Sequence, residues 1–263
     1  MSIEAEYNVS IAGYTIVSHL GGGGFGTVFL ASSDTSRQLV AIKVLHQLGY
    51  DPEKRFDREI RILQERSNQN CVEIFDFGVT NSGLKYYAME YCPLGNIRKL
   101  LGYVNPRFTY RLLIDICYAL GTFHSREGFH RDLKPDNILL WESQDRLMFK
   151  LGDFGLAQDN NTSSIFTNNA AGTLGYIAPE IIAGEGFTPA SDIYSLGVTV
   201  REAITGNLKD RIPSMGELGF LQVLTKMMTH RSPTQRPTYE KIHSMAQREE
   251  IRLIKSKTKT VTA

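Results

Sequence analysis

Two short stretches in the middle of the chain contain side chains whose types and spacing could carry out chemistry. Residues 130–137 read His-Arg-Asp-Leu-Lys-Pro-Asp-Asn, and Asp153 follows in the sequence Asp-Phe-Gly. Transfer of a phosphoryl group needs a carboxylate that orients the attacking hydroxyl and oxygen ligands that hold Mg²⁺ against the phosphates. Asp132, Asn137 and Asp153 can supply both. Each of these residues alone would more often form a turn or cap a helix, so only their combination indicates this chemistry.

The elements around these residues are predicted to bring them together. The apolar runs at residues 138–140 and 147–149 are typical of short strands. If the two strands pair, Asn137 at the start of the first and Asp153 after the second lie near the same metal ion.

A glycine-rich segment precedes this region. Gly21, Gly23 and Gly26 lie between strand-like residues 14–17 and 28–31, which predicts a hairpin with glycines at its tip. Without side chains, backbone N–H groups can approach phosphates closely. A strand on both sides argues against the dinucleotide-binding fold, in which the glycines open a helix. A flexible turn is the alternative reading of the glycines alone.

The next predicted strand has Ala41 and Lys43 on one face, while the other face has Val40, Ile42 and Val44. The small side chain of Ala41 leaves room for a flat ring such as adenine. Lys43, on the same face, could reach the α- and β-phosphates. The alternative is an edge-strand lysine that faces water.

A helix is expected after this strand, because Asp51 and Pro52 are typical of an N-cap and a first helical position. Its inward stripe contains Phe56, Glu59, Ile60 and Leu63. A carboxylate on an apolar face needs a partner, and Lys43 is the natural one. The sequence therefore predicts a Lys43–Glu59 ion pair.

Together these residues resemble the eukaryotic-like (Hanks-type) protein kinases of the Ser/Thr class, a family with bacterial members, over about residues 14–245. The resemblance implies an α+β fold of two lobes, with ATP bound between them: a small antiparallel β-sheet lobe with one helix and a larger, mainly helical lobe. The lobes are expected at residues 14–92 and 93–247, joined by a hinge near residues 90–94. An N-terminal extension, residues 1–13, and a basic, frayed tail, residues 248–263, are expected to flank them.

The resemblance also implies how the phosphates are held and transferred. Asp132 would be the catalytic base, Lys134 a contact of the γ-phosphate, and Asn137 and Asp153 the ligands of Mg²⁺, or of Mn²⁺ in its place. The residues implied to hold the phosphates of ATP are Gly21, Gly23, Gly26 and Lys43, the last paired to Glu59.

The adenine ring is implied to contact several further residues. Met89 corresponds to the gatekeeper, and backbone groups of Glu90 and Cys92 would lie near the ring. The side chains that would sandwich the ring are those of Val28, Ala41 and Leu139.

Regulation by phosphorylation is implied by Arg131, because an arginine directly before the catalytic aspartate often pairs with a phosphorylated residue in this family. Residues 158–171 would form the activation segment, with Thr167 as the leading site of autophosphorylation. A polar loop that is not phosphorylated is the alternative. Thr173 is implied to bond the catalytic Asp and Lys, as in kinases that act on Ser and Thr.

Two structural features of the large lobe are also implied. Glu180 would pair with Arg236, and residues 192–197 would form the central buried helix. Between Gly206 and Arg236 the chain is shorter than is typical of the family, so the lobe is expected to be shortened after that helix. The helix that is missing there commonly helps to dock protein substrates, so the protein substrate stays unidentified.

Composition is that of an ordinary enzyme. The chain has 263 residues, 42% hydrophobic content and a net charge of +1, which gives no reason to expect a nucleic-acid partner. No apolar run is long enough to span a membrane, and no leader is recognised, so a cytoplasmic location is expected. Cys71, Cys92 and Cys117 fit neither a disulfide framework nor a zinc pattern. The oligomeric state is not indicated.

Two other classes of function stay open. A pseudokinase, a nucleotide-binding scaffold that does not transfer phosphate, would keep the same fold. A small-molecule phosphotransferase of the antibiotic-modifying kind shares the spacing of the aspartate and asparagine, but normally lacks the element between Thr173 and Glu180.

Overall fold

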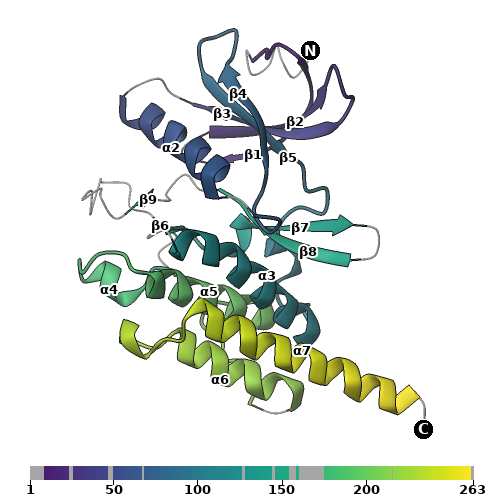
Figure 1. Ribbon diagram of the computed structural model, residues 1–263, viewed down its shortest axis with the longest axis vertical. Coiled ribbons are helices and arrows are strands. Elements are labelled where there is room, and N and C mark those ends of the chain that lie inside the picture. Colours follow the sequence, from purple (N-terminus) through teal and green to yellow (C-terminus); the bar gives the residue numbers. More distant parts are fainter. Residues whose placement is uncertain are drawn as a thin grey trace. The chain divides into compact units, whose positions relative to one another are not determined.

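The computed structural model describes residues 9–23, 26–46, 50–66, 68–125, 128–143, 146–153, 158–159, 175–214 and 216–261. In these residues the chain forms two compact units, divided in sequence between Pro93 and Leu94. The first is a sheet with one helix, and the second is mainly helical (Figure 1). This is the α+β architecture that the sequence predicted.

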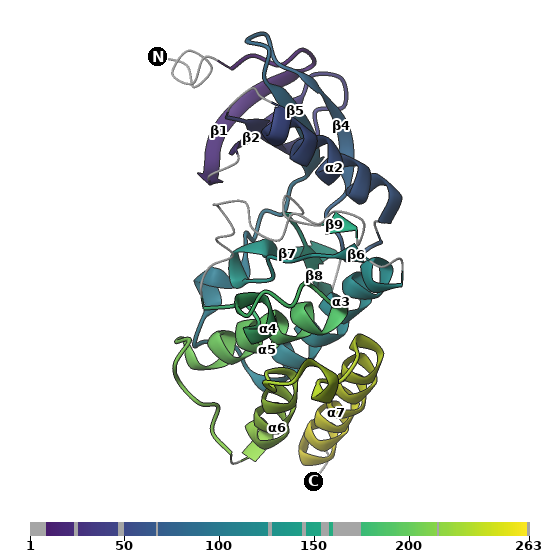
Figure 2. The ribbon, with the colours of Figure 1, turned by 90° about the vertical axis from the view of Figure 1, so that its left-hand side faces the viewer.

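The first unit contains an antiparallel sheet with the strand order β1-β2-β3-β5-β4. Its strands are β1 (Tyr14–Gly23), β2 (Gly26–Ser33), β3 (Leu39–Leu45), β4 (Ile74–Val79) and β5 (Lys85–Glu90), and its helix is α2 (Tyr50–Arg66). Figure 2 shows α2 lying against this sheet.

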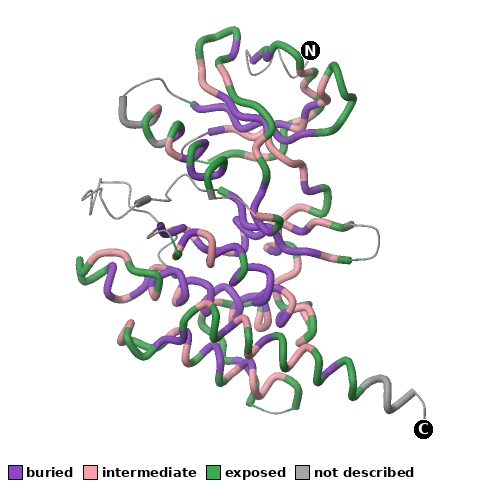
Figure 3. The backbone as a smooth tube through the Cα atoms, viewed as in Figure 1, coloured by how far each residue is buried: buried purple, intermediate pink, exposed green. Residues whose placement is uncertain are grey.

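The alternation of side chains along β3 gives the sheet two different faces. Val40, Ile42 and Val44 are buried in one apolar cluster with Phe29 and Ala88, as the sequence predicted. Residues of the opposite parity face the other way, toward α2. The strand is buried along most of its length, and Figure 3 shows it as part of the buried centre of this unit.

Helix α2 covers the second face of the sheet through its predicted inward stripe. Phe56 and Ile60 pack with Leu45 and Tyr87 in a separate apolar cluster. The helix begins at Tyr50, so Asp51 lies within its first turn, and the expectation that Asp51 is the N-cap is wrong. A proline in the first turn is still tolerated, because the N–H groups there have no partner within the helix.

The second unit is built from helices around one short hairpin. Its helices are α3 (Pro106–His124), α4 (Pro179–Ile182), α5 (Pro189–Thr205), α6 (Gly219–Met228) and α7 (Tyr239–Val261). Its strands are β6 (Gly128–Phe129), β7 (Ile138–Ser143), β8 (Arg146–Leu151) and β9 (Gln158–Asp159), and its 3₁₀ turns are η1 (Ile97–Leu100), η2 (Pro135–Asn137), η3 (Gly216–Leu218) and η4 (Pro233–Gln235).

Helices α3 and α5 form the core of this unit, and both are largely buried (Figure 3). Gly197 on α5 allows close packing against α6, since a Cβ atom there would lie 2.8 Å from the Cβ atom of Met228. The predicted central buried helix is therefore confirmed, within a helix that extends from Pro189 to Thr205.

The two apolar runs predicted as strands form the antiparallel pair β7–β8. Ile138 lies opposite Leu151, and the backbone N–H of Gly152 donates to the carbonyl of Asn137 at 2.9 Å. Asn137 and Gly152 are therefore neighbours at one end of this hairpin.

The C-terminal end of the chain differs from the sequence prediction. Helix α7 continues to Val261, so the expectation of a frayed tail from about Arg248 is wrong. Leu253 is buried, and Arg252 pairs with Glu249 one turn earlier. Tertiary burial thus supports a helix in a segment whose composition alone offers little to bury.

Between α5 and α6 the described residues include only the short turn η3, which confirms that the helical unit is shortened after its central helix. None of the described helices is long and apolar enough to cross a lipid bilayer.

Candidate active site

Lys43 and Glu59 form the ion pair expected from the sequence, within the first unit. The ammonium of Lys43 donates to both carboxylate oxygens of Glu59, at 2.9 and 3.0 Å. The hydroxyl of Tyr87 donates to the same carboxylate at 2.7 Å. Lys43 is 7% exposed and Glu59 2% exposed. A buried pair that is held by several hydrogen bonds fixes the position of the lysine side chain.

The register of the sheet places the predicted adenine and phosphate residues of this unit on one face. Val28 lies opposite Lys43, and Ala41 lies opposite Met89. Directly opposed residues of an antiparallel pair point to the same side, and side chains along a strand alternate. These four side chains therefore share the face on which α2 packs. Because the side chain of Ala41 is small, it leaves space on this face of the sheet among the other three side chains.

The hinge candidates follow directly after β5. The backbone N–H of Glu90 donates to the carbonyl of Glu73 at 2.8 Å, and Cys92 is buried. Leu139, the third residue expected around adenine, lies half-buried on β7 of the second unit. The adenine candidates thus belong to both units.

The three glycines of the predicted phosphate loop differ in their surroundings. A Cβ atom at Gly26 would lie 2.6 Å from the carbonyl oxygen of Val44, so this glycine is required by the close approach of β2 and β3. A Cβ atom at Gly23 would have no described neighbour within 4 Å, and the same holds for Gly21. Gly21 and Gly23 thus have room around them for a ligand.

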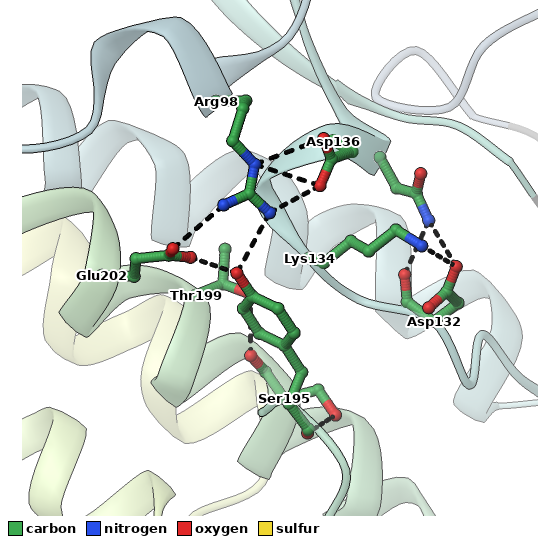
Figure 4. Close-up of polar contacts among 9 residues, drawn as sticks. Arg98, Asp132, Lys134, Asp136, Ser195, Thr199 and Glu202 are labelled. Carbon is green, nitrogen blue, oxygen red and sulfur yellow. Dashed lines mark hydrogen bonds and ion pairs between the residues drawn. The ribbon is translucent and has the colours of Figure 1, made fainter. Parts of the chain in front are cut away.

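In the second unit, Asp132, Lys134 and Asn137 are joined by hydrogen bonds (Figure 4). The ammonium of Lys134 donates to Oδ2 of Asp132 at 2.7 Å. Nδ2 of Asn137 donates to the same oxygen at 3.0 Å and to the backbone carbonyl of Asp132 at 2.8 Å. Asn137 is held by the turn η2, in which its N–H donates to the carbonyl of Lys134. The 3₁₀ turn η2 and the residues just before it thus bring a carboxylate, an ammonium and an amide together.

Burial raises the pKa of the Asp132 carboxyl above its usual value, although the hydrogen bond from Lys134 opposes this. The negative charge of Asp153 also raises the pKa of Asp132, so the two carboxyls lie close enough to interact. A raised pKa makes a carboxylate a better proton acceptor.

Asn137 and Asp153 are suited to hold Mg²⁺. The backbone carbonyl of Asn137 accepts a hydrogen bond from the N–H of Gly152, the residue before Asp153. The hairpin therefore brings Asn137 and Asp153 close together. Asp153 has a φ of 56°, in the left-handed region that is uncommon for residues other than glycine. The described residues contain no group of three His, Cys, Asp or Glu side chains that could bind a metal by themselves. Mg²⁺ usually takes one or two carboxylates and completes its shell with water and phosphate oxygens, so this donor set fits.

His130 connects the two parts of this site. Its Nε2 lies 3.1 Å from the carbonyl oxygen of Gly152, and its Nδ1 accepts from the backbone N–H of Asp132 at 3.3 Å. A single neutral tautomer satisfies both contacts. The fully buried imidazole thus fixes the backbone before Asp153 relative to the backbone of Asp132.

Asp192 anchors the loop that carries Asp132, a role that the sequence reading missed. Its carboxylate accepts from the backbone N–H groups of His130 and Arg131, each at 2.9 Å, and from Nε2 of His124 at 3.0 Å. Burial alone would raise the pKa of Asp192, but these hydrogen bonds lower it below its ordinary value. The sequence had assigned this residue only to core support.

Arg131 has a φ of 69°. Its guanidinium lies 4.5 Å from the ring centre of Phe187 and 5.9 Å from that of Phe129. Stacking on aromatic rings limits the directions in which the planar guanidinium can point. The proposed regulatory residues Thr167 and Thr173 lie outside the described residues.

Glu180 and Arg236 form the pair that the resemblance implied. Two guanidinium nitrogens of Arg236 donate to the two carboxylate oxygens of Glu180, at 2.6 and 2.7 Å, and both side chains are buried. Although burial would raise it, the pKa of Glu180 is lowered by the hydrogen bond from Arg236. Ser191 donates to the same carboxylate. This pair joins α4 to the chain that enters α7.

A second polar network, next to the turn that contains Asn137, was not predicted. Arg98 of η1 contacts the carboxylates of Asp136 and Glu202 and the hydroxyl of Tyr176 (Figure 4). Glu202 is 104 positions from Arg98 in the sequence. No local pattern could have indicated this contact.

A family model described as "Protein kinase domain" matches residues 14–214 of the chain. The chain is 34% identical over 205 residues to the probable serine/threonine-protein kinase pknA2 of Bifidobacterium longum and 33% identical over 211 residues to the serine/threonine-protein kinase PrkC of Bacillus subtilis. It is 32% identical over 205 residues to the inhibitor of nuclear factor kappa-B kinase subunit alpha of Danio rerio. These matches cover 74%, 78% and 73% of this chain, but only 27%, 31% and 27% of the relatives. The chain thus corresponds to less than a third of each of them.

Proposed function

Because the chain belongs to the protein kinase family, we propose that it transfers the γ-phosphoryl group of ATP to serine or threonine hydroxyls of proteins. The observation that carries this proposal is the cluster in which Lys134 and Asn137 both donate to the carboxylate of Asp132. It combines a proton acceptor, a cation for the transferred phosphate and a metal-ligand side chain. The names of the bacterial relatives support Ser and Thr as acceptors.

In this proposal, residues of the first unit hold the nucleotide. Lys43, fixed by Glu59, contacts the α- and β-phosphates, and the backbone at Gly21 and Gly23 approaches them without a side chain in the way. Val28, Ala41 and Met89 provide an apolar surface for adenine, and Leu139, a residue of the second unit, is proposed as a further contact of the ring. Backbone groups of Glu90 and Cys92 bond the edge of the ring.

Residues of the second unit act on the transferred group. Asp132 orients the substrate hydroxyl and accepts its proton, and burial, which raises the pKa of this carboxyl, favours that step. Lys134 offsets the charge that develops on the γ-phosphate. Asn137 and Asp153 would hold Mg²⁺, which would offset the negative charge of the phosphates when bound. Mn²⁺ has the same oxygen preference.

The chain's own regulation is part of the proposal. Arg131, whose guanidinium lies over the rings of Phe129 and Phe187, is suited to bind a phosphate bidentately, and autophosphorylation at Thr167 would supply one. The three cysteines of the chain are buried and form no disulfide with one another, which fits a reducing compartment such as the cytoplasm.

The proposal is tested with γ-labelled ATP, Mg²⁺ and generic acceptor proteins, followed by phosphoamino-acid analysis. We expect label on serine and threonine. A protein that binds nucleotide but transfers no label would instead be a pseudokinase scaffold, and label on tyrosine alone would contradict the acceptor class. Mass spectrometry of protein incubated with Mg-ATP tests autophosphorylation, which requires a phosphate between Asp159 and Thr173.

A further inference from the structure

One guanidinium joins two carboxylates next to the catalytic loop. Nε and Nη2 of Arg98 donate to the carboxylate of Asp136 at 2.6 to 3.2 Å, and Nη1 donates to Oε1 of Glu202 at 2.9 Å. Nη2 also donates to the hydroxyl of Tyr176 at 3.1 Å, and that hydroxyl donates to the other oxygen of Glu202. Figure 4 shows the carboxylates on either side of the guanidinium.

The two carboxylates would not share this place without a cation. The side chain of Glu202 is 7% exposed, and an ionised carboxylate that is buried beside a second one is unfavourable unless a positive charge offsets both. Arg98 supplies that charge from within the chain. The hydrogen bonds to Asp136 raise the pKa of Arg98 above its ordinary value, so the cation persists throughout the physiological pH range.

The cluster is connected to the proposed site of phosphate transfer. Asp136 is the residue before Asn137, within the same turn η2, and Asn137 donates to Asp132. The side chains of Arg98 and Asp136 are 34% and 42% exposed, so solvent reaches this part of the cluster. A polypeptide whose hydroxyl lies at Asp132 would therefore pass close to Asp136.

We propose that Arg98 determines substrate specificity by occupying an acidic subsite: its guanidinium fills the place between Asp136 and Glu202 that a basic side chain of a peptide substrate would otherwise take. This inference rests on the proposed protein kinase function. In the native protein the guanidinium of Arg98 already occupies this place and neutralises both carboxylates. An arginine side chain of the substrate would be repelled by the positive charge of Arg98, so it adds no binding energy there. Without Arg98, the carboxylates of Asp136 and Glu202 and the hydroxyl of Tyr176 become available to an arginine side chain of the substrate.

The test compares peptides that share one threonine acceptor and carry a single arginine or alanine at each flanking position in turn. The wild-type protein should show arginine-to-alanine ratios of kcat/KM near or below one at every position. Arg98→Gln, which keeps much of the side-chain volume, should raise that ratio about tenfold at one position, a change of about 1.4 kcal/mol. Arg98→Lys keeps a cation in the cluster and should behave as the wild type.

A second variant identifies the acidic partner. The double variant Arg98→Gln with Asp136→Asn should lose the gained preference, because half of the acidic pair is then neutral. Millimolar guanidinium ion should compete with the arginine peptide in Arg98→Gln and not in the wild type, which a merely structural role of Arg98 would not produce.

The outcomes separate this inference from the proposed function. Peptide affinity is measured in parallel by fluorescence anisotropy, which does not require phosphate transfer. A wild-type protein without transferase activity would overturn the proposed function. If folded Arg98→Gln shows unchanged arginine-to-alanine ratios of both kcat/KM and affinity, the proposed role of Arg98 is wrong. The role is also wrong if the wild-type protein already prefers arginine at the peptide position where the variant does.

Discussion

Asp192 accepts a hydrogen bond from the backbone N–H of Arg131 at 2.9 Å, which ties the loop that carries Asp132 to the central helix α5. The same carboxylate accepts from the N–H of His130. Arg131 has a φ of 69°, a conformation that costs free energy and needs support from its surroundings. The position of the loop that carries Asp132 therefore depends on the buried side chain of Asp192.

Replacing Asp192 should damage both stability and activity. Asp192→Ala leaves two buried N–H groups and His124 without their acceptor, so we expect a loss of about 3–5 kcal/mol in the free energy of unfolding. Denaturant titration measures that loss. Asp210→Asn, a change at an exposed acid of the same unit, should alter the free energy by less than about 0.5 kcal/mol. Equal effects of the two substitutions would contradict the anchoring role.

The ion pair of Glu180 with Arg236 predicts a pH dependence of stability. The pKa of Glu180 is lowered in the folded protein, so its contribution is fully present above the unfolded pKa, about 4.5, and is lost as the pH falls through the folded value. The difference in melting temperature between wild type and Glu180→Gln should therefore be constant from pH 6 to 8 and shrink below about pH 4.5. A difference that instead grows on acidification would show that the sign of the shift is wrong.

Gly26 and Gly23 provide a matched pair of substitutions in the phosphate loop. Gly26→Ala forces a Cβ atom to 2.6 Å from the carbonyl oxygen of Val44, so it should destabilise the sheet by about 1–3 kcal/mol. Gly23→Ala meets no described atom within 4 Å, so it should leave the melting temperature nearly unchanged and weaken ATP binding. Thermal unfolding with and without nucleotide distinguishes the two effects. If Gly23→Ala bound ATP as the wild type does, this glycine would not lie at the phosphates.

The carboxylate of Glu59 should matter for nucleotide binding as well as for stability. Glu59→Gln removes one charge of a buried pair, so we expect lower stability and a dissociation constant for ATP that is at least about tenfold higher. Tyr87→Phe removes the hydrogen bond to the same carboxylate but keeps both charges, and should cost only about 0.5–1.5 kcal/mol of stability. Isothermal titration calorimetry with Mg-ATP compares the variants. Equal affinities in all three proteins would refute the role of the pair.

Local patterns were enough to predict much of the fold and part of the site. The alternation around Lys43 and the stripe that contains Glu59 indicated their pairing, because both side chains project from regular elements with known periods. The two strands after Asn137 followed from short apolar runs. The pair of Glu180 with Arg236 came only from the family resemblance, since 56 residues separate them.

Contacts that depend on tertiary packing could not be predicted in this way. Asp192 looked like any core residue of an amphipathic helix, because its bonds go to a loop about 60 residues earlier. Nothing in the sequence around Arg98 indicated its contacts, since Glu202 lies far along the chain. The tail after Arg248 was expected to fray because its composition is polar, whereas burial of Leu253 supports a helix there.

Comparison of Asp132→Asn with the wild type in one preparation shows whether Asp132 serves phosphate transfer or folding. The pKa of Asp132 is raised in the folded protein, so the charge of this carboxylate opposes folding. This cost is present above the pKa of the folded state and is relieved below the pKa of the unfolded state. At pH 7 the variant should therefore be at least as stable as the wild type. Its turnover with Mg-ATP and an acceptor protein should fall by about 10²–10⁴, with the dissociation constant for ATP nearly unchanged. Phosphate transfer by Asp132→Asn at the wild-type rate would show that Asp132 is not the proton acceptor.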